Sequence, residues 1–480
     1  MKKTLLSLLS VFTAVILTFT GTFAAPVLSG SAGVSSETTQ NGYEESTAEI
    51  PLLSGEGTVE QPYIIASVKD FAKAAVMIAE KNSLYGESVY SIVSCIDFGG
   101  ANFKPLGNEN APFKGTLLGN NHRLINIACS DVSNFGVVGC MTKGSIQEVH
   151  AQYTDNEYAI KNVVNFGGIV GKIQAKSSVN VDKCTATGII TFNSEKELNC
   201  GGIAGKVDAE VGNVYFNDCG ADVSLSVYSE NSDGYVGGFA GKCEAKSGCN
   251  FEMVHCFSYG DVLLETRKTS VYAAGFVSFA NKDENGWSGW TDEGDGMLYA
   301  TGDSSFTNCF VTGNVKSSSN GGKVVANDAT CLNVSKMYYS SAQTIEANDE
   351  INCGTKVIAS NFRSSTYLSK TLGFDMKNLW SLGNDGKLKN SNMCYDCVLA
   401  SFEISDTTVT VSDFNGEFSL AVASFTENVM KDIVFTYIGA NDSVTFKELE
   451  LDTDGADCVK AFLFEKDTLK PVYNSISVSL

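Results

Sequence analysis

Arginine is scarce in this chain of 480 residues, which holds only Arg123, Arg267 and Arg363. Bidentate recognition of phosphate or uronate groups relies on the guanidinium group, so few positions can provide it. Acidic residues outnumber basic ones by 55 to 34, and the formal net charge is −21. We therefore expect no nucleic acid or other anionic polymer as a partner, and we interpret the acidity as a device that keeps the protein soluble.

Long apolar runs are lacking beyond the N-terminus. Residues 1–24 carry two lysines, an apolar stretch and small residues, which is the pattern of a secretory signal peptide cleaved near Ala24. Residues 25–50 are rich in Ser, Thr, Gly and Glu and predict a flexible leader. The closing residues, NSISVSL, contain no apolar span and no sorting motif. We expect a protein that is secreted or associated with the cell surface and has no membrane span.

Glycine, in contrast, is abundant and periodic. The glycine-rich stretch NFGGIVGKIQ at residues 165–174 resembles a phosphate-binding loop, but it does not match the Walker pattern. Similar stretches, which we call glycine boxes, recur along the chain. Successive boxes are separated by 34, 36 and 37 residues. We interpret the role of the glycines as structural, because glycine permits sharp bends and close approach of neighbouring backbone. The repeated positions are Gly168, Gly171, Gly202, Gly205, Gly238 and Gly241.

A strand-like phrase follows each box and carries a cysteine at the same place, namely Cys184, Cys219, Cys256 and Cys309. Short phrases that alternate at period two, in a repeat of this length, predict a β-solenoid with three short strands per coil. Equivalent positions should stack about 4.8 Å apart, so the cysteines are predicted to form a buried ladder of free thiols. Disulfides between adjacent coils remain the alternative, since secreted chains rich in cysteine are commonly cross-linked.

The phrasing of the repeats resembles a known family. GGIVGK followed by CTATG is similar to the GLUG-type repeats of secreted and surface proteins from Gram-positive, clostridial-type gut bacteria. Residues 55–75, 95–107 and 113–127 resemble the opening of right-handed, pectin-lyase-like β-helices, and STYLSKTLGFDMKNLWSLGNDGKL resembles the phrase that closes them. The resemblance implies an all-β fold with a right-handed parallel β-helix over residues 51–393. It is specific for architecture and unspecific for activity, because one fold serves many functions.

Both ends of the solenoid are expected to differ from its coils. Residues 67–81 begin with a capping Ser67 and predict a helix that covers the first coil. From residue 394 to 480, alternating strands predict a small β-sandwich. Its closing phrase resembles a C-terminal accessory module of such secreted proteins, with Phe464 in place of the usual tryptophan. The apolar stripe of the helix consists of Phe71, Ala74, Ala75, Ile78 and Ala79.

Enzymes of the pectin-lyase-like fold leave signatures in the sequence. A polygalacturonase-type site would show N-T-D, an adjacent Asp pair and G-H-G, and none of these occurs. The three histidines, His122, His150 and His255, lie in strand-like phrases, where a wall or turn role is favoured over catalysis. CYDC at residues 394–397 is a lone C-x-x-C, so no metal or other cofactor is predicted.

One interval breaks the period, because 53 residues separate Cys256 from Cys309. Insertions in solenoids form loops on one face, frequently the binding face. Exposed indoles stack on sugar rings, and carboxylates bind hydroxyl groups or Ca²⁺. The alternative is that the tryptophans fold back and seal the loop against the wall. The candidate ligand-binding residues in the insertion are Trp287, Trp290, Asp292, Glu293 and Asp295.

These features predict a non-catalytic, adhesin-like protein that presents a β-helix surface to glycans or to host or partner proteins. A divergent polysaccharide lyase or glycoside hydrolase on the same solenoid is one alternative. A purely structural extracellular component is another.

Overall fold

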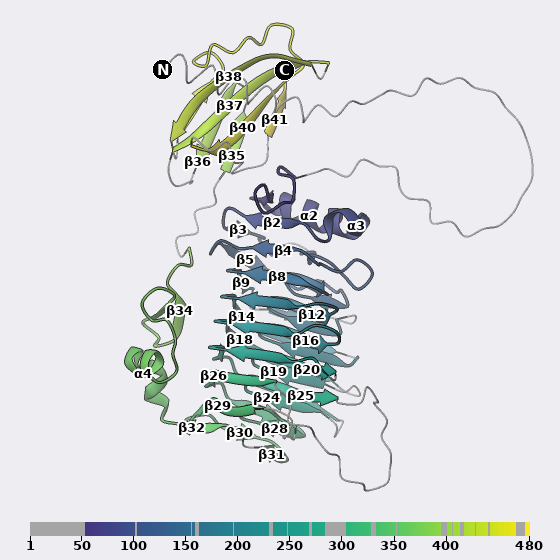
Figure 1. The fold of residues 1–480 in the computed structure, drawn as a ribbon, viewed down its shortest axis with the longest axis vertical. Helices are drawn as coiled ribbons and strands as arrows, with labels where there is room; N and C mark the ends of the chain where they lie inside the picture. Colours follow the sequence, from purple (N-terminus) through teal and green to yellow (C-terminus); the bar gives the residue numbers. More distant parts are fainter. Residues whose placement is uncertain are drawn as a thin grey trace, which may run out of the picture. The chain divides into compact units, whose positions relative to one another are not determined.

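The computed structural model describes residues 53–480 with gaps in the chain (Figure 1). The gaps are 101–102, 155, 159–162, 195, 230–233, 247, 268–270, 284–303, 328–332, 352, 395–400, 406, 413–416, 428, 440–441 and 467–475.

The first part of the described chain is a right-handed parallel β-helix, as the sequence predicted. Its strands pair in parallel into stacked sheets along the solenoid (Figure 1). One sheet consists of β7 (Val138–Met141), β12 (Val170–Ala175), β16 (Ala204–Ala209), β20 (Ala240–Lys246) and β25 (Val277–Asp283). A second consists of β6 (Asn134–Phe135), β11 (Asn165–Gly167), β15 (Leu198–Gly201), β19 (Gly234–Gly237), β24 (Tyr272–Ala274), β28 (Asn320–Gly322) and β31 (Asp349–Ile351).

The remaining solenoid strands belong to one large sheet that wraps two sides of the coils. Its first members are β1 (Tyr63–Ile65), β2 (Val89–Ile92), β3 (Ile96–Asp97), β4 (Thr116–Leu118), β5 (Arg123–Ile127), β8 (Gly144–Gln147), β9 (His150–Tyr153) and β10 (Asn156–Tyr158). The middle coils add β13 (Val179–Asp182), β14 (Thr185–Ser194), β17 (Val214–Asn217), β18 (Gly220–Ser229), β21 (Phe251–Val254), β22 (Phe257–Ser258) and β23 (Val262–Thr266). The last coils add β26 (Ser305–Val311), β27 (Val315–Ser317), β29 (Asn333–Ser340), β30 (Ile345–Glu346) and β32 (Thr355–Val357).

Each central coil contains four strand segments, so the prediction of three strands per coil is wrong. The coil that begins at Asn165 runs through β11, β12, β13 and β14 before the next coil begins with β15. The chain bends at the glycine box between β11 and β12, which belong to different sheets, and it turns again at Lys183 between β13 and β14, which belong to one sheet. The predicted repeat length is confirmed, because Val170 pairs with Ala204, Ala204 with Ala240, and Ala240 with Val277.

The glycine boxes lie where neighbouring coils approach closely. A Cβ atom added to Gly168 would lie 2.3 Å from the carbonyl oxygen of Gly202, and one added to Gly202 would lie 2.3 Å from that of Gly238. These distances are far below van der Waals contact, so no larger residue fits without moving the backbone. The second column is equally tight, since a Cβ atom on Gly205 would lie 2.5 Å from the carbonyl oxygen of Gly171.

The four cysteines of the repeat stack inside the solenoid. Cys184, Cys219, Cys256 and Cys309 are fully buried and are free thiols. Each follows a residue with left-handed backbone, such as Lys183 with φ 53°, so the chain turns a corner just before the cysteine enters the core. The thiols donate to backbone carbonyl groups, as from Cys184 to Asp182 at 3.2 Å. Cysteine suits this corner because its side chain is small and its weakly donating S–H group finds a backbone carbonyl group nearby.

The first coil is covered by a helix, as the sequence predicted. Helix α2 (Val68–Glu80) begins after Ser67, whose hydroxyl oxygen accepts from the backbone N–H group of Asp70. A short helix, α3 (Asn82–Tyr85), follows it (Figure 1). The buried apolar residues are Phe71, Ala74, Ala75, Met77 and Ile78, so Met77 takes the place predicted for Ala79, which is exposed.

Residues 359–393 leave the coil path and pack on one flank of the solenoid. They form the 3-10 helix η1 (Ala359–Arg363), helix α4 (Ser365–Lys370) and a hairpin of β33 (Trp380–Leu382) and β34 (Leu388–Asn390). We call these residues the cover segment. Its side chains Phe362, Leu368, Leu372, Phe374, Leu379, Trp380 and Leu388 form a cluster with Phe257 and Phe310 of the solenoid wall.

The C-terminal residues form two antiparallel sheets, which confirms the predicted β-sandwich. One sheet contains β35 (Ser401–Ser405), β36 (Thr408–Ser412) and β39 (Asp442–Thr445). The other contains β37 (Glu417–Thr426), β38 (Val429–Gly439), β40 (Cys458–Glu465) and β41 (Ile476–Ser479). Apolar side chains from both sheets, such as Val411, Leu420 and Val459, share one core.

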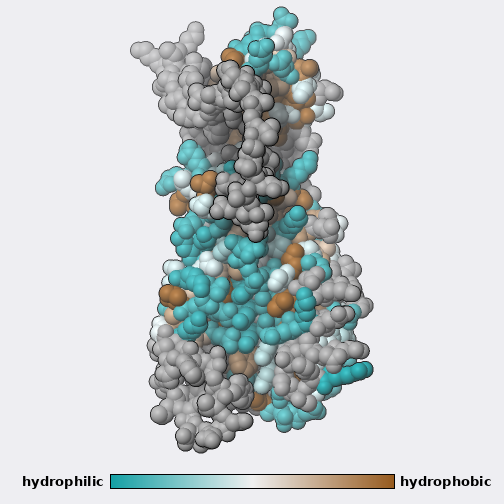
Figure 2. Space-filling view, turned by 90° about the vertical axis from the view of Figure 1, so that its right-hand side faces the viewer, coloured by the Kyte–Doolittle hydropathy of each residue, from teal (hydrophilic) through white to brown (hydrophobic). Residues whose placement is uncertain are grey.

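The outer face of the sheet that contains β12, β16 and β20 is mostly hydrophilic where it is described (Figure 2). Lysines occupy equivalent positions on the three strands, since Lys172 pairs with Lys206 and Lys206 with Lys242. Each of them lies beside a carboxylate, as Lys242 does at 3.2 Å from Glu244. The charges on this face are therefore largely paired with one another.

Candidate functional site

The ligand-binding residues predicted in the insertion, Trp287, Trp290, Asp292, Glu293 and Asp295, lie outside the described residues. The insertion joins β25 to β26 in the chain. Its role as a binding loop therefore stays a prediction.

A polar groove of about 310 Å³ lies between the flank of the solenoid and the cover segment. Its volume falls at the lower end of the range of small-molecule sites in proteins. The solenoid contributes side chains from successive coils, and the cover segment contributes the residues around β34. Strands that are distant in the sequence thus form opposite walls of one site.

The solenoid wall of the groove consists of two rows in register. In the first row Arg123 pairs with His150 and His150 with Thr185. Two residues further along the strands, Thr187 pairs with both Gln152 and Asp222, and this makes the second row. Both rows face the same side because side chains two residues apart on a strand point to one face of the sheet.

The cover segment is anchored to this wall by polar contacts. Lys387 Nζ donates to both carboxylate oxygens of Asp222, at 2.6 and 2.8 Å. The backbone N–H group of Leu388 donates to the hydroxyl oxygen of Tyr259 at 2.9 Å. Each ionic side chain is more than a third exposed, so the ion pair contributes about 0–1 kcal/mol to stability and both partners are accessible to a ligand.

Two histidines near the groove are held in the neutral form. Burial, with help from the charge of Arg123, lowers the pKa of His150 to about 3. Its Nδ1 lies 2.8 Å from the hydroxyl oxygen of Thr185, which fixes the ring in the wall. Burial also lowers the pKa of His122. At neutral pH both rings are uncharged, and His150 is too weak a base to abstract a proton efficiently.

Asp385 of the cover segment is a poor general acid. Partial burial alone would raise its pKa, but the backbone N–H group of Lys387 and the ammonium groups of Lys389 and Lys387 hold the pKa below its ordinary value. A glycosidase needs one carboxyl group that keeps its proton near neutral pH. Asp385 therefore suits hydrogen bonding and charge pairing better than proton donation.

The cysteine ladder offers no reactive thiol. Burial raises the pKa of Cys184, Cys219 and Cys256 well above the ordinary value, so the thiolate form is suppressed. A thiol must be exposed and have a lowered pKa to act as a nucleophile or redox sensor. The ladder is a packing device. His255 has a similarly structural place, since it occupies the left-handed corner before Cys256 with φ 50°.

Sequence reasoning missed the groove because its walls come from distant parts of the chain. Asp222 and Lys387 are separated by 165 residues, and no local motif links them. The one signal available was the closing phrase that contains LGNDGKL, which supplies Asp385 and Lys387. Side-chain alternation on β14 and β18 would have placed Thr185, Thr187 and Asp222 on one face. It would not have shown that the cover segment packs opposite this face.

Comparisons with known proteins add little about activity. No protein-family model matches the chain. Halomucin of Haloquadratum walsbyi is 27% identical over 180 residues, which cover 35% of this chain and 2% of halomucin. Among solved structures, a chain of an IgA1 protease gives a TM-score of 0.35 at 12% identity, over 85% of this chain and 34% of that chain. The chain thus spans a small part of halomucin and about a third of the protease chain.

Within the described part of the chain, no helix has the length and apolar character needed to cross a membrane.

Proposed function

We propose that this protein is a non-catalytic, adhesin-like binding protein that holds a glycan, or a polar segment of a partner protein, in the groove beside the cover segment. The observation that supports the proposal is the arrangement of two in-register polar rows opposite Asp385 and Lys387. The groove combines hydroxyl, amide, ammonium and carboxylate groups within one concave site. Concave sites with convergent polar groups are where ligands are usually bound.

The chemistry of these groups suits a ligand rich in hydroxyl groups. A sugar both donates and accepts hydrogen bonds, and the groove offers acceptors on Asp222 and Gln152 and donors on Lys387. Leu388 and Met393 add apolar surface to the lining, against which the carbon face of a sugar can pack. The lowered pKa of Asp385 makes this carboxyl group a poor proton donor, which fits a role in hydrogen bonding to a ligand.

We further propose that the protein acts outside the cell, as a secreted or surface-associated member of the GLUG-type repeat proteins of Gram-positive bacteria. Support comes from the signal-peptide pattern of residues 1–24 and from the repeat phrasing around Gly168. The β-helix gives such a protein a long, regular surface on which a groove can be held rigidly.

A glycan array combined with a reducing-sugar assay on the same purified protein tests the proposal. The groove variant carries Asp222→Asn and Lys387→Gln together, because removing both charges leaves neither partner unpaired. Loss of two polar contacts should weaken binding by about tenfold or more. The matched control is Lys316→Gln, which removes an exposed ion pair with Glu346 outside the groove lining.

Binding that is weakened in the groove variant and kept in the control would support the proposal. Equal binding by both variants would place the ligand elsewhere on the protein. Release of reducing sugar would overturn the proposal of a non-catalytic protein and favour a lyase or hydrolase.

A further inference from the structure

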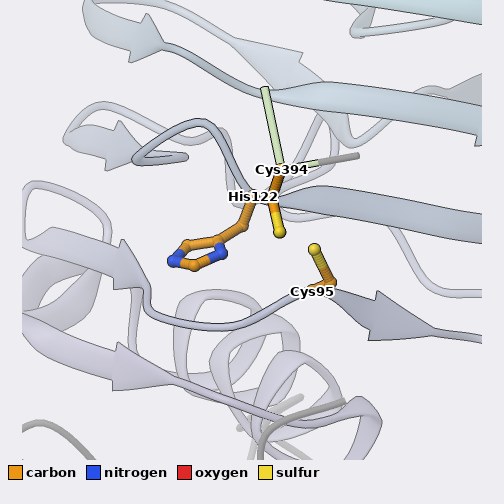
Figure 3. A group of neighbouring side chains, drawn as sticks. All are labelled: Cys95, His122 and Cys394. Carbon is orange, nitrogen blue, oxygen red and sulfur yellow. The ribbon is translucent and has the colours of Figure 1, made fainter. Parts of the chain in front are cut away.

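Two cysteines and a histidine from distant parts of the chain meet at the start of the solenoid. Cys95 lies between β2 and β3, His122 directly precedes β5, and Cys394 follows the cover segment. Their ligand atoms all lie within 4.8 Å of one another. Figure 3 shows both sulfur atoms close together, with Nδ1 of the His122 ring on the side that faces them.

Backbone hydrogen bonds hold these three residues in place. The N–H group of Arg123 donates to Sγ of Cys95 at 3.4 Å, and the N–H group of Cys394 donates to the carbonyl oxygen of Asn121 at 3.0 Å. The turn before His122 has left-handed backbone at Asn120, whose side chain donates to the carbonyl oxygen of Ile92 at 2.8 Å. The cluster is therefore built on fixed backbone.

One atom in the cluster is left without a partner. Nδ1 of His122 is buried and makes no hydrogen bond to the described residues. A buried polar atom in this state is costly, so its position calls for an explanation. A disulfide between Cys95 and Cys394 would leave the nitrogen unsatisfied. A metal ion held by both sulfur atoms would also accept the lone pair of this nitrogen.

We propose that Cys95, His122 and Cys394 bind a Zn²⁺ ion. Two thiolates and an imidazole are ligands that zinc prefers, and this set contains none of the oxygen ligands that Ca²⁺ and Mg²⁺ require. Binding releases the two thiol protons to solvent as the sulfur atoms become ligands. The fourth tetrahedral position is open to water or to a further ligand.

The ion ties the chain end of the cover segment to the first coils. His122 and Cys394 are the neighbours of Arg123 and Met393, which line the groove, so the ion also fixes one end of that site. The sequence prediction of no metal rested on the lone C-x-x-C at residues 394–397, whose Cys397 lies outside the described residues. The structure brings Cys95 and His122 to Cys394, although both precede it by more than half of the chain.

Zinc binding to the full secreted chain, reduced and kept free of oxygen, tests the proposal. We expect one equivalent of Zn²⁺ by metal analysis and, with Co²⁺ as the probe, an absorption spectrum with sulfur-to-cobalt charge transfer. Since loss of an outer partner already lowers metal affinity by about 10–100-fold, Cys95→Ser, His122→Ala and Cys394→Ser should each lower it by at least about 100-fold. Cys458→Ser, which removes a thiol of the β-sandwich, is the matched control and should bind zinc normally.

Circular dichroism shows which variants keep their β-structure, and the Co²⁺ spectrum of the unaltered chain reports thiolate ligation without any variant. Failure of the reduced chain to bind one equivalent would overturn the proposal, and so would equal affinity in the three ligand variants and the control. A Cys95–Cys394 disulfide in the purified protein, with no zinc bound after its reduction, would show that the cysteines are a cross-link instead.

Discussion

Replacing Gly202 by alanine should destabilise the solenoid strongly, because the glycine column leaves no room for a Cβ atom. The new atom would lie 2.3 Å from the carbonyl oxygen of Gly238 and 2.6 Å from Cβ of Ala221. One of these neighbours is backbone and the other is a short, fixed side chain, so neither can rotate away. Overpacking of a core by a single methyl group typically costs about 1–3 kcal/mol, and we expect the upper end of that range here.

The matched control is Gly234→Ala, at the start of β19. A Cβ atom there would lie 3.5 Å from the nearest side-chain atom of Leu264, which is ordinary contact. Alanine should be neutral at this position, or stabilise by about 0.4–1 kcal/mol through the unfolded chain. Urea unfolding followed by circular dichroism gives the midpoint and slope for both variants. Equal midpoints for the two variants would refute the close-approach argument.

Three further predictions test other parts of the structure. Burial lowers the pKa of His150 to about 3, so this ring takes up a proton far more readily in the unfolded chain than in the folded one. The free energy of unfolding should therefore fall by about 2 kcal/mol between pH 7 and pH 5. His150→Gln should make the free energy of unfolding less dependent on pH over this range, as measured by unfolding at each pH. An unchanged slope would mean that the ring is not buried neutral. Thiol titration of the native protein should leave the cysteine ladder unreacted, and titration after unfolding without reductant should find several free thiols; one thiol at most would establish disulfides. If the indoles of Trp287 and Trp290 are exposed and add a second contact to the glycan, replacing both by alanine should lower the affinity by about tenfold at an unchanged Tm, whereas a large drop in Tm would show that they pack against the wall.

The sequence predicted the solenoid well because the same local pattern recurs in each coil, and each recurrence strengthens the prediction. Each coil repeats the glycine box and the cysteine corner, so the register that pairs Val170 with Ala204 could be read from spacing alone. The capping helix was predicted from Ser67 and the apolar stripe. One of the five predicted stripe residues was wrong, because Met77 is buried and Ala79 is exposed. The number of strands per coil was missed because the left-handed corner between β13 and β14 falls at Lys183, a residue type that does not mark a turn by itself.

The stack of buried asparagines was not predicted, although Asn165 begins the quoted stretch NFGGIVGKIQ. Asn165 donates to the side-chain oxygen of Asn134 at 2.6 Å, and Asn199 donates to that of Asn165 at 2.9 Å. Their role shows only when coils are superposed, since each side-chain N–H group donates to the asparagine oxygen of the coil before it. The groove and the Cys95–His122–Cys394 cluster were missed for a related reason. Both depend on where the cover segment returns to the solenoid, and no local pattern encodes that contact.

Hydrogen–deuterium exchange with and without the strongest ligand from the glycan array tests the central claim most directly. The groove accounts for binding if protection appears in the peptides that cover residues 185–187 and 385–393, which form its two walls. Backbone amides in β14 and β34 should then exchange more slowly in the complex, while peptides from β12 and β16 stay unchanged. Protection confined to residues 284–303, with none at either wall, would contradict the account and place the site in the insertion.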